Sequence, residues 1–397
     1  MKVLFVSQEF PPATAWGGIG TYAGIVTRAL ARQGAEVHVL CVVPGQRRED
    51  AVADGVHVHL RPLRRPRGVG RLLRLPQTWG RISLAAAVLH HQRGLGVGFD
   101  VCESPEWWAE GLGISMRGRL PLVVRLHSGA AQIFPHTGQA GADARLAIRC
   151  EEALIRGADL ITGTAPIVES VAAQLHLPAD RLRPIPYPVE AGEAAGDSAR
   201  PPQVLFAGRL EPRKGPDTLL RAVPIVLAER PETRFLFLGA DADGPDGRPF
   251  RSALERIVRD LEIGHAVEMP GRRGGPETVA RELARSTLCA VPSRWESMGY
   301  VAAEAAALGR PVVASRIPAL EEIVEDRVTG RLVEPEDVDG WAAAILELLS
   351  ASKRRRRRIG EAAARLIAAK CDPDLVAVQT IEAYEEAIRR RRLGSGR

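Results

Sequence analysis

A short apolar run, a glycine-containing loop and an amphipathic helix follow one another near the start of the chain, and the same succession returns after residue 202. In the first copy, Val3–Ser7 has the length of a buried strand, and Thr21–Gln33 has helical periodicity and ends before Gly34. Glu36–Val43 then returns to a strand pattern. Apolar strands that alternate with helices predict a parallel sheet covered on both faces.

The second copy follows residues 190–202, which are rich in Ala, Gly, Glu and Pro and have no apolar period, so we interpret them as a linker. Val204–Ala207 is then predicted as a strand, Gly208–Gly215 as a loop and Asp217–Glu229 as a helix. Further strands are predicted at 120–126, 160–164, 234–238, 266–269, 288–291 and 311–314, and further helices at 342–349 and 374–390.

The fold class is therefore α/β, with two tandem Rossmann-like, doubly wound domains that face each other across a cleft. Residues 1–189 form the first domain and residues 203–373 the second, and we expect the helix at about 374–393 to pack back on the first. A length of 397 residues suits two domains. Open α/β sheets bind ligands at the carboxyl ends of their strands, so we expect the cleft to hold the substrates.

Composition narrows the class of protein. The longest apolar runs fall short of the ~18 residues of a membrane-spanning helix, and the start of the chain lacks the features of a signal peptide. The five cysteines are far apart, with no metal or redox spacing, which is typical of small core residues. We therefore expect a cytoplasmic protein in a reducing compartment. Peripheral contact with the inner face of a membrane is the less favoured interpretation.

The positive charge lies mainly near the C-terminus. Lys353–Arg358 and Arg389–Arg392 contain ten of the 54 Lys and Arg, and the remaining cations are outnumbered by 48 Asp and Glu. No aromatic residues alternate with these arginines, so solvated helix faces are favoured over a nucleic-acid site. Residues 55–99 also contain no Asp or Glu but many Arg and His. Whether this stretch binds an anionic acceptor stays open.

Two glycine-containing loops suggest phosphate binding. Gly17 and Gly18 follow the first strand and precede a helix, whose N-terminal amides can meet an anion, although the full dinucleotide fingerprint is absent. In the second domain, Arg209 and Lys214 share the loop that opens a helix. An Arg can bridge two phosphate oxygens while a Lys adds a point charge.

Two carboxylates flank a helix start further on. Glu296 lies in the loop after a predicted strand, and Glu304 lies eight positions later, about two turns into the following helix. The amides of Gly299 and Tyr300 lie between them and can meet an anion. This arrangement suits a sugar, a diphosphate and a ribose.

His127 follows a strand of the first domain and is expected to face the cleft. Three nearby carboxylates, Glu103, Glu106 and Glu110, are candidates for a general base, although a surface role is the favoured interpretation.

With these motifs in place, the chain resembles the retaining GT-B glycosyltransferases of family 4, which use nucleotide sugars. The resemblance covers almost the whole length. It is carried by Gly17-Gly18, by Gly208-Arg209 with Lys214, by the Glu296–Glu304 pair and by the run Gly309–Ser315 after the second glutamate.

The resemblance implies a role for each matching residue. Arg209 and Lys214 would bind the donor diphosphate, Glu296 the donor sugar and Glu304 the nucleotide ribose. Implied further donor contacts are Gly17, Gly18, Arg272, Met298, Gly299 and Tyr300. His127 would reach the transferred sugar, and Arg149 would face the acceptor. His127, Glu296, Arg209 and Lys214 form the implied catalytic set.

The implied reaction moves a sugar from a UDP- or GDP-sugar to a hydroxyl of a glycan, a lipid-linked or a small natural-product acceptor, with retained configuration. No metal or cofactor is expected, because Arg209, Lys214 and a helix N-terminus already supply positive charge for the leaving diphosphate. The pair Asp241 and Asp243 is interpreted as a solvated turn. A sugar-nucleotide epimerase, a phosphorylase or a non-catalytic nucleotide-sugar sensor stays open as an alternative, as does the oligomeric state.

Overall fold

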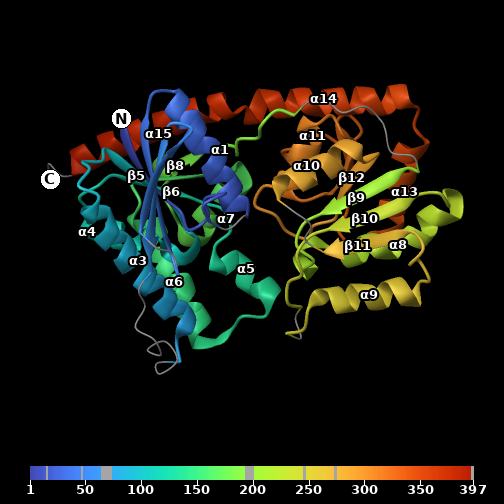
Figure 1. Cartoon of the computed structure of the whole chain (residues 1–397), viewed down its shortest axis with the longest axis horizontal. Helices are drawn as coiled ribbons and strands as arrows, with labels where there is room; N and C mark the ends of the chain where they lie inside the picture. Colours follow the sequence, from blue (N-terminus) through green and yellow to red (C-terminus); the bar gives the residue numbers. More distant parts are fainter. Residues whose placement is uncertain are drawn as a thin grey trace. The chain divides into compact units, whose positions relative to one another are not determined.

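The computed structural model describes residues 1–14, 17–45, 48–63, 74–192, 201–244, 247–271 and 275–394. The chain divides into two compact units (Figure 1). Unit 1 comprises Met1–Pro188 together with Pro373–Arg397, and unit 2 comprises Val189–Asp372. Most of the predicted linker 190–202 lies outside the described residues.

Unit 1 contains an eight-stranded sheet in the order β3-β4-β2-β1-β5-β6-β7-β8. The strands are β1 (Lys2–Val6), β2 (Glu36–Val43), β3 (Glu49–Ala53), β4 (Val56–Pro62), β5 (Val101–Pro105), β6 (Leu122–Arg125), β7 (Leu160–Gly163) and β8 (Leu182–Pro184). All neighbouring strands pair in parallel except β3, which forms an antiparallel pair with β4 at the edge. The inner strands are buried on both faces, which explains their continuous apolar sequence.

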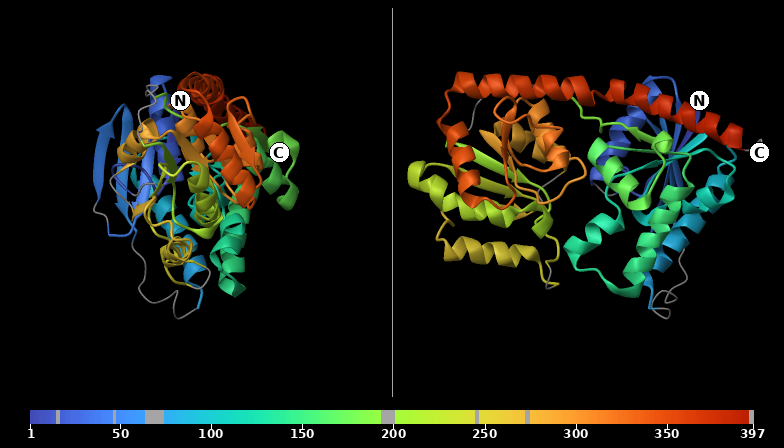
Figure 2. Two further views of the ribbon diagram at one scale, coloured as in Figure 1. Left: turned by 90° about the vertical axis from the view of Figure 1, so that its right-hand side faces the viewer. Right: turned by 180° about the vertical axis from the view of Figure 1, so that it is seen from behind.

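Helices cover the sheet of unit 1. They are α1 (Gly18–Arg32), α3 (Pro76–Gly94), α4 (Leu112–Arg117), α5 (Ala130–Thr137), α6 (Gly141–Gly157), α7 (Ala165–Leu175) and α15 (Pro373–Gly394). Helix α15 packs against α1 and strands β5, β6 and β7, and it crosses the sheet in the rear view (Figure 2). Helices α3, α4 and α6 pack against one another. Tyr384 of α15 donates a hydrogen bond to buried Glu103 at 2.7 Å, so the last helix completes the core of this unit.

Unit 2 contains a parallel six-stranded sheet in the order β11-β10-β9-β12-β13-β14. The strands are β9 (Gln203–Ala207), β10 (Arg234–Leu238), β11 (Val267–Gly271), β12 (Leu288–Val291), β13 (Val312–Ser315) and β14 (Gly330–Val333). The helices are α8 (Pro216–Glu229), α9 (Phe250–Asp260), α10 (Pro276–Arg285), α11 (Tyr300–Ala307), α12 (Pro318–Glu321), α13 (Val338–Ser350) and α14 (Lys353–Cys371). Trp341 of α13 is fully buried in the main core of the unit, together with Phe235 and Phe237.

The two basic runs lie on helices. Most residues of Lys353–Arg358 are exposed at the start of α14, as a solvated helix face requires. In the second run, Arg390 and Arg391 pair with Asp180 and Asp159 of unit 1 at 3.0 and 2.7 Å. This second run therefore helps to attach α15 to its unit.

Candidate active site

The order of strands in unit 2 brings two loops together. The chain proceeds outward from β9 to β10 and β11, and then returns to place β12 on the other side of β9. The loops that follow β9 and β12 are therefore neighbours at the carboxyl edge, at the point where the winding direction reverses. Doubly wound sheets bind ligands at this point. Arg209 and Lys214 lie in the first loop and Glu296 lies in the second.

Lys214 and Glu296 are in direct contact across these loops. The ammonium Nζ of Lys214 donates to Oε1 of Glu296, and the hydroxyl of Ser293 donates to the same oxygen at 2.7 Å. Arg213 adds a second cation, with its Nη1 atom 3.5 Å from Oε2 of Glu296 and its Nη2 atom 2.6 Å from Glu211. Arg213 is 7% exposed. It was not predicted as a site residue, although it stands beside Lys214 in the same motif.

The protonation of this pair follows from its surroundings. Burial lowers the pKa of Lys214, opposed by the charge of Glu296. Burial would raise the pKa of Glu296, but the charges of Lys214 and Arg213 and the hydrogen bonds to it outweigh that effect and lower the pKa. Glu296 is therefore ionised near neutral pH and can accept hydrogen bonds from sugar hydroxyls.

Arg209 is the exposed cation of the first loop. Its side chain is 57% exposed, and its Nη2 atom lies 3.3 Å from Oε1 of Glu211. The guanidinium is thus held near Arg213 and Lys214 by a shared carboxylate while its donors remain accessible to solvent. Such a set of cations can meet the oxygens of a diphosphate.

Close backbone packing fixes the two loops against each other. Gly215 has a φ of +65°, and a Cβ atom there would lie 1.9 Å from the carbonyl oxygen of Pro292. The amide of Arg294 donates to the carbonyl of Arg213 at 2.8 Å. Glycine at 215 therefore allows the Lys214 loop to approach the Glu296 loop.

The start of α11 also lies beside Glu296. Gly299 precedes the helix with a φ of +84°, and a Cβ atom there would lie 2.4 Å from Cδ2 of Leu320. Met298 is 4% exposed, so its side chain belongs to the core in this structure, and Tyr300 is the first helical residue. The first amides of α11 are placed to meet negative charge.

Glu304 is the fifth residue of α11 and lies about one turn into the helix, which corrects the prediction of two turns. The difference arises because the helix begins only after Gly299. Burial raises the pKa of Glu304 to about 7. No charge or hydrogen bond from the described residues opposes this effect of burial on the carboxyl group.

Replacing Glu304 by glutamine is expected to stabilise the protein without ligand above neutral pH. The raised pKa means that the unfolded chain ionises first, so wild-type stability falls between about pH 4.5 and pH 7 and stays reduced above it. Glutamine removes this loss, which is about 3 kcal/mol for a pKa raised from 4.5 to about 7, or several degrees in Tm.

Thermal unfolding of both proteins at pH 5 and pH 8 measures this difference, since the other titrating groups are shared. The same substitution should weaken nucleotide binding. A variant that is less stable than the wild type at pH 8 would contradict the assigned setting of Glu304.

In unit 1, His127 lies directly after β6 and is 5% exposed. Its amide donates to both carboxylate oxygens of Glu106, at 2.8 and 2.9 Å, and its Nδ1 atom lies 2.6 Å from the hydroxyl of Tyr187. The ring packs edge-on against those of Tyr22 and Tyr187. Burial, followed by the charge of Arg125, lowers the pKa of His127, so the imidazole is neutral near pH 7.

The surface role favoured for Glu103, Glu106 and Glu110 is wrong, because all three are at most 2% exposed. Glu103 accepts hydrogen bonds from Tyr22 and Tyr384. Burial raises the pKa of Glu106 and of Glu110 to about 8. Glu106 and Glu110 each line a cavity of unit 1. No sequence signal distinguished the three carboxyl groups from solvated acids.

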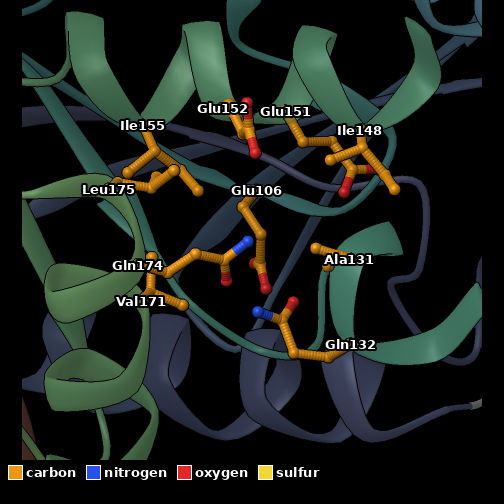
Figure 3. Close-up of a pocket in the computed structure, with 11 residues that line it drawn as sticks. Glu106, Ala131, Gln132, Ile148, Glu151, Glu152, Ile155, Val171, Gln174 and Leu175 are labelled. Carbon is orange, nitrogen blue, oxygen red and sulfur yellow. The ribbon is translucent and has the colours of Figure 1, made fainter. Parts of the chain in front are cut away.

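A small cavity of about 20 Å³ lies beside Glu106 (Figure 3). Gln132, Gln174, Glu151 and Glu152 are drawn around it with several aliphatic side chains. This volume holds about one water molecule, so the cavity is too small for a sugar.

A larger cavity of about 560 Å³ lies at the carboxyl ends of β1, β2 and β5. It is lined by Gln8, Glu9, Ala13, Thr14, Ile19, Val43, Pro44, Trp107, Trp108 and Glu110. Gly17 precedes α1 and Gly18 begins it, and the Glu9 carboxylate accepts a hydrogen bond from the amide of Gly20 at 3.2 Å. A Cβ atom at Gly17 would lie 2.3 Å from that carboxylate. Glu9 therefore already places negative charge at this helix N-terminus.

The remaining predicted residues fall elsewhere. Arg149 is an exposed residue of α6 and lines neither of these cavities. Arg272 lies outside the described residues. Asp241 and Asp243 form isolated backbone bridges with Leu210 and Pro249. Within the described ranges, no group of three or more His, Cys, Asp or Glu is placed to hold a metal ion.

The arginines of the acid-free stretch are not all available to a ligand. Arg81 is fully buried and donates two hydrogen bonds to Glu151, at 2.7 and 2.9 Å. Arg61 is 3% exposed and pairs with Asp50 at 2.7 Å. Residues 64–73 lie outside the described residues. None of the helices described here has the length and apolar character needed to cross a membrane.

Both halves of the chain match known families. Residues 17–188 match the family described as "Glycosyl transferase 4-like domain", and residues 201–351 match "Glycosyl transferases group 1". A D-inositol 3-phosphate glycosyltransferase from Thermobispora bispora is 31% identical, over 94% of this chain and 91% of the relative. A glycogen synthase from Mycobacterium tuberculosis is 28% identical, over 99% of this chain and 96% of the relative.

Solved structures show the same fold. Sucrose-phosphate synthase from Thermosynechococcus elongatus has a TM-score of 0.74 and 22% identity, with 97% of this chain and 98% of that chain covered. The catalytic domain of starch synthase IV from Arabidopsis thaliana, bound to ADP and acarbose, has a TM-score of 0.75 and 14% identity, with coverage of 98% and 99%. The predicted fold class is confirmed. The chain belongs to the group 1 glycosyltransferases, glycosyltransferase family 4, and has the GT-B fold.

Proposed function

We propose that this glycosyltransferase moves a sugar from a UDP- or GDP-sugar to a hydroxyl group, with retained anomeric configuration and without a metal ion. The observation that carries the proposal is the cluster of Arg209, Arg213 and Lys214 beside Glu296 at the point where the sheet of unit 2 reverses its winding. HepE from Anabaena, which shares the fold, was solved with UDP and glucose.

The residues of unit 2 divide the donor among them. Arg209 and Lys214 bind the diphosphate, and the first amides of α11 meet its remaining oxygens. Glu296 accepts hydrogen bonds from the sugar hydroxyls, and Glu304 accepts them from the ribose. Arg272 serves the base, and Met298 contributes its backbone rather than its buried side chain.

In the reaction, the acceptor oxygen forms a bond to the anomeric carbon while the bond from that carbon to the phosphate oxygen breaks. The electron pair leaves with the nucleoside diphosphate, and the hydroxyl proton passes to a phosphate oxygen. Preorganised cations stabilise the departing charge, so the step needs neither a metal nor a separate base. His127, neutral and fixed by Tyr187, contributes hydrogen bonding to the transferred sugar.

Removal of divalent cations is expected to leave the rate unchanged. The release of nucleoside diphosphate from UDP- and GDP-sugars, with and without EDTA, measures this directly. A loss of activity that Mg²⁺ or Mn²⁺ restores would contradict metal independence.

The configuration of the product decides the stereochemical part of the proposal. Nuclear magnetic resonance of the new glycosidic bond should show the configuration of the donor, and inversion would exclude the mechanism.

Incubation with donor alone separates a transferase from an epimerase and from a non-catalytic sensor. Slow hydrolysis favours a transferase, an epimerised sugar favours an epimerase, and tight nucleotide binding without turnover favours a sensor.

A further inference from the structure

Arg294 has a side chain that joins three segments of unit 2. It lies in the loop that follows β12, and its side chain is 25% exposed. The Nε atom donates to Glu336 at 2.8 Å. The Nη1 atom donates to Oδ1 of Asp217 at 2.9 Å and to the carbonyl oxygen of Pro212. The Nη2 atom donates to Oδ2 of Asp217 at 2.9 Å and to the hydroxyl of Thr218 at 3.3 Å, so all five N–H donors of the guanidinium have a partner.

The segments that Arg294 joins carry residues of the donor site. Pro212–Lys214 is a single 3₁₀ turn, and Asp217 lies in the first turn of α8, which follows it. The guanidinium therefore bonds to the chain two residues before Lys214 and three residues after it. Arg294 itself stands two residues before Glu296. One side chain thus connects the loop of the catalytic lysine to the loop of the sugar-binding glutamate.

The backbone of the turn is held from the same side. Pro212 also accepts a hydrogen bond from the amide of Gly215 at 3.0 Å, which closes the turn around Lys214. The amide of Arg294 donates to the carbonyl of Arg213 at 2.8 Å. The position of the turn therefore depends on the main chain and the side chain of Arg294 together.

The pair of Arg294 and Asp217 is ionised and bidentate. The Asp217 side chain is 13% exposed, and its Oδ2 atom also lies 2.9 Å from Nη1 of Arg221. Burial would raise the pKa of Asp217, but the hydrogen bonds from Arg294 and Arg221 outweigh that effect and lower the pKa. Two parallel N–H···O bonds fix the orientation of both groups, which a single point charge does not.

The guanidinium of Arg294 is not itself one of the donor-binding groups. Within the described part of the chain, it forms no hydrogen bond or ion pair with Lys214 or Glu296. Its effect on the reaction would therefore act through the place at which it holds Lys214. A displacement of about 1 Å in a group at the reacting centre can cost about 10²-fold in rate.

We propose that Arg294 is a positioning residue of the transfer reaction. Its bidentate pair with Asp217 and its bond to the Pro212 carbonyl fix the turn Pro212–Lys214, and with it the ammonium that meets the departing diphosphate. The inference rests on the proposed function, in which Lys214 stabilises that charge.

Hydrogen exchange followed by mass spectrometry tests the structural part without any substrate. Arg294→Met keeps a long side chain and removes all five donors. We expect the amides of residues 208–218 to exchange at least tenfold faster in this variant than in the wild type, because the turn opens more often. Unchanged exchange in this segment would overturn the proposal.

Arg316→Met is the matched control. Arg316 also follows a strand of the same sheet, β13, and its guanidinium lies 3.1 Å from Asp326 and 3.3 Å from Glu334. This variant should leave the exchange of residues 208–218 and the transfer rate within twofold of the wild type. If it accelerates exchange in that segment as much as Arg294→Met does, the effect is a general loss of stability and the proposal is wrong.

Transfer rates test whether Arg294 acts through Lys214. Arg294→Met should lower kcat by about tenfold with a smaller rise in the KM of the donor, because the charge on the diphosphate is greatest as the bond breaks. In a Lys214→Ala background the same substitution should lower the rate by less than twofold, since the group that it positions is already absent. An equal tenfold loss in both backgrounds would show that Arg294 acts elsewhere.

Two conservative variants test the bidentate pair, and they serve also if Arg294→Met does not fold. Arg294→Lys keeps the charge without the parallel bonds and should remain at least threefold slower than the wild type. Asp217→Asn keeps one acceptor oxygen, should lower kcat by about threefold, and should add no further loss to Arg294→Lys. Full activity of Arg294→Lys, or independent losses from the two substitutions, would contradict the role of the pair.

The two kinds of measurement separate this inference from the proposed function. If the wild type releases no nucleoside diphosphate from a UDP- or GDP-sugar, the proposed function fails, and hydrogen exchange still decides whether Arg294 fixes the turn. If the wild type is active and Arg294→Met exchanges faster but keeps its rate, the positioning role alone is wrong.

Discussion

Replacing Lys214 by alanine is expected to lower the rate of transfer by about 10²-fold or more, the size of effect that follows the loss of one preorganised donor at a developing negative charge. The ammonium contacts Glu296 at the carboxyl edge of unit 2, and Arg213 lies 3.5 Å from the same carboxylate. The variant would leave the departing diphosphate with one cation fewer and Glu296 with a weaker partner.

Steady-state rates of nucleoside diphosphate release, with saturating acceptor and varied donor, measure the effect of Lys214→Ala. Arg209→Ala should act in the same direction. Arg357→Ala is the matched control, because it removes a cation of unit 2 whose side chain is 81% exposed on α14. An unchanged rate for Lys214→Ala would refute the role of the cation cluster, while an equal loss in the control would point to a general effect of charge.

Replacing Arg81 by alanine is expected to reduce the free energy of unfolding of unit 1 by about 3–5 kcal/mol, as is typical when one partner of a buried ion pair is removed. The side chains of Arg81 and Glu151 are 0% and 4% exposed. Glu151 also accepts hydrogen bonds from the amides of Ala130 and Trp108, at 2.6 and 3.1 Å. Without the guanidinium, its charge would be buried without a cationic partner.

Urea unfolding followed by circular dichroism measures the loss, with separate transitions expected where the two units unfold independently. The double variant Arg81→Met and Glu151→Gln removes both charges and keeps an acceptor for one of the two amides, so it should recover part of the stability. A single variant as stable as the wild type would show that the pair contributes nothing. The single variant should also disturb the larger cavity of unit 1, since Arg81 lies against both of the indoles that line it.

The inner strands could be predicted from the sequence because both of their faces are buried. Leu288–Val291 was predicted with the bounds that β12 has, and Arg234–Leu238 with those of β10. The edge strand β3 was missed because its five residues are all exposed and carry no apolar signal. The basic start of α14 was interpreted as a helix face, but the extent of this helix to Cys371 was not predicted, since the arginine-rich start hides the apolar period.

The donor residues could be placed in loops, but their contacts depend on strand order. Nothing in the spacing of Lys214 and Glu296 shows that β9 and β12 are neighbours, which the sheet establishes.

The burial of Glu110 is a second feature that the sequence does not predict. An isolated glutamate is exposed in most proteins, so its burial could not be predicted from composition. It follows from the turn at Trp107–Ala109, where two residues with positive φ direct the chain inward.

The position of α15 has a consequence for the order in which the protein is made. Residues 1–188 leave the ribosome long before residues 373–394, yet both segments belong to unit 1. Until α15 is synthesised, the carboxylate of Glu103 lacks the hydroxyl of Tyr384, and strands β5, β6 and β7 lack the helix that covers them. Unit 2, whose segments are contiguous, can therefore complete its fold first, and the half of the chain that is translated earliest is the last to be finished.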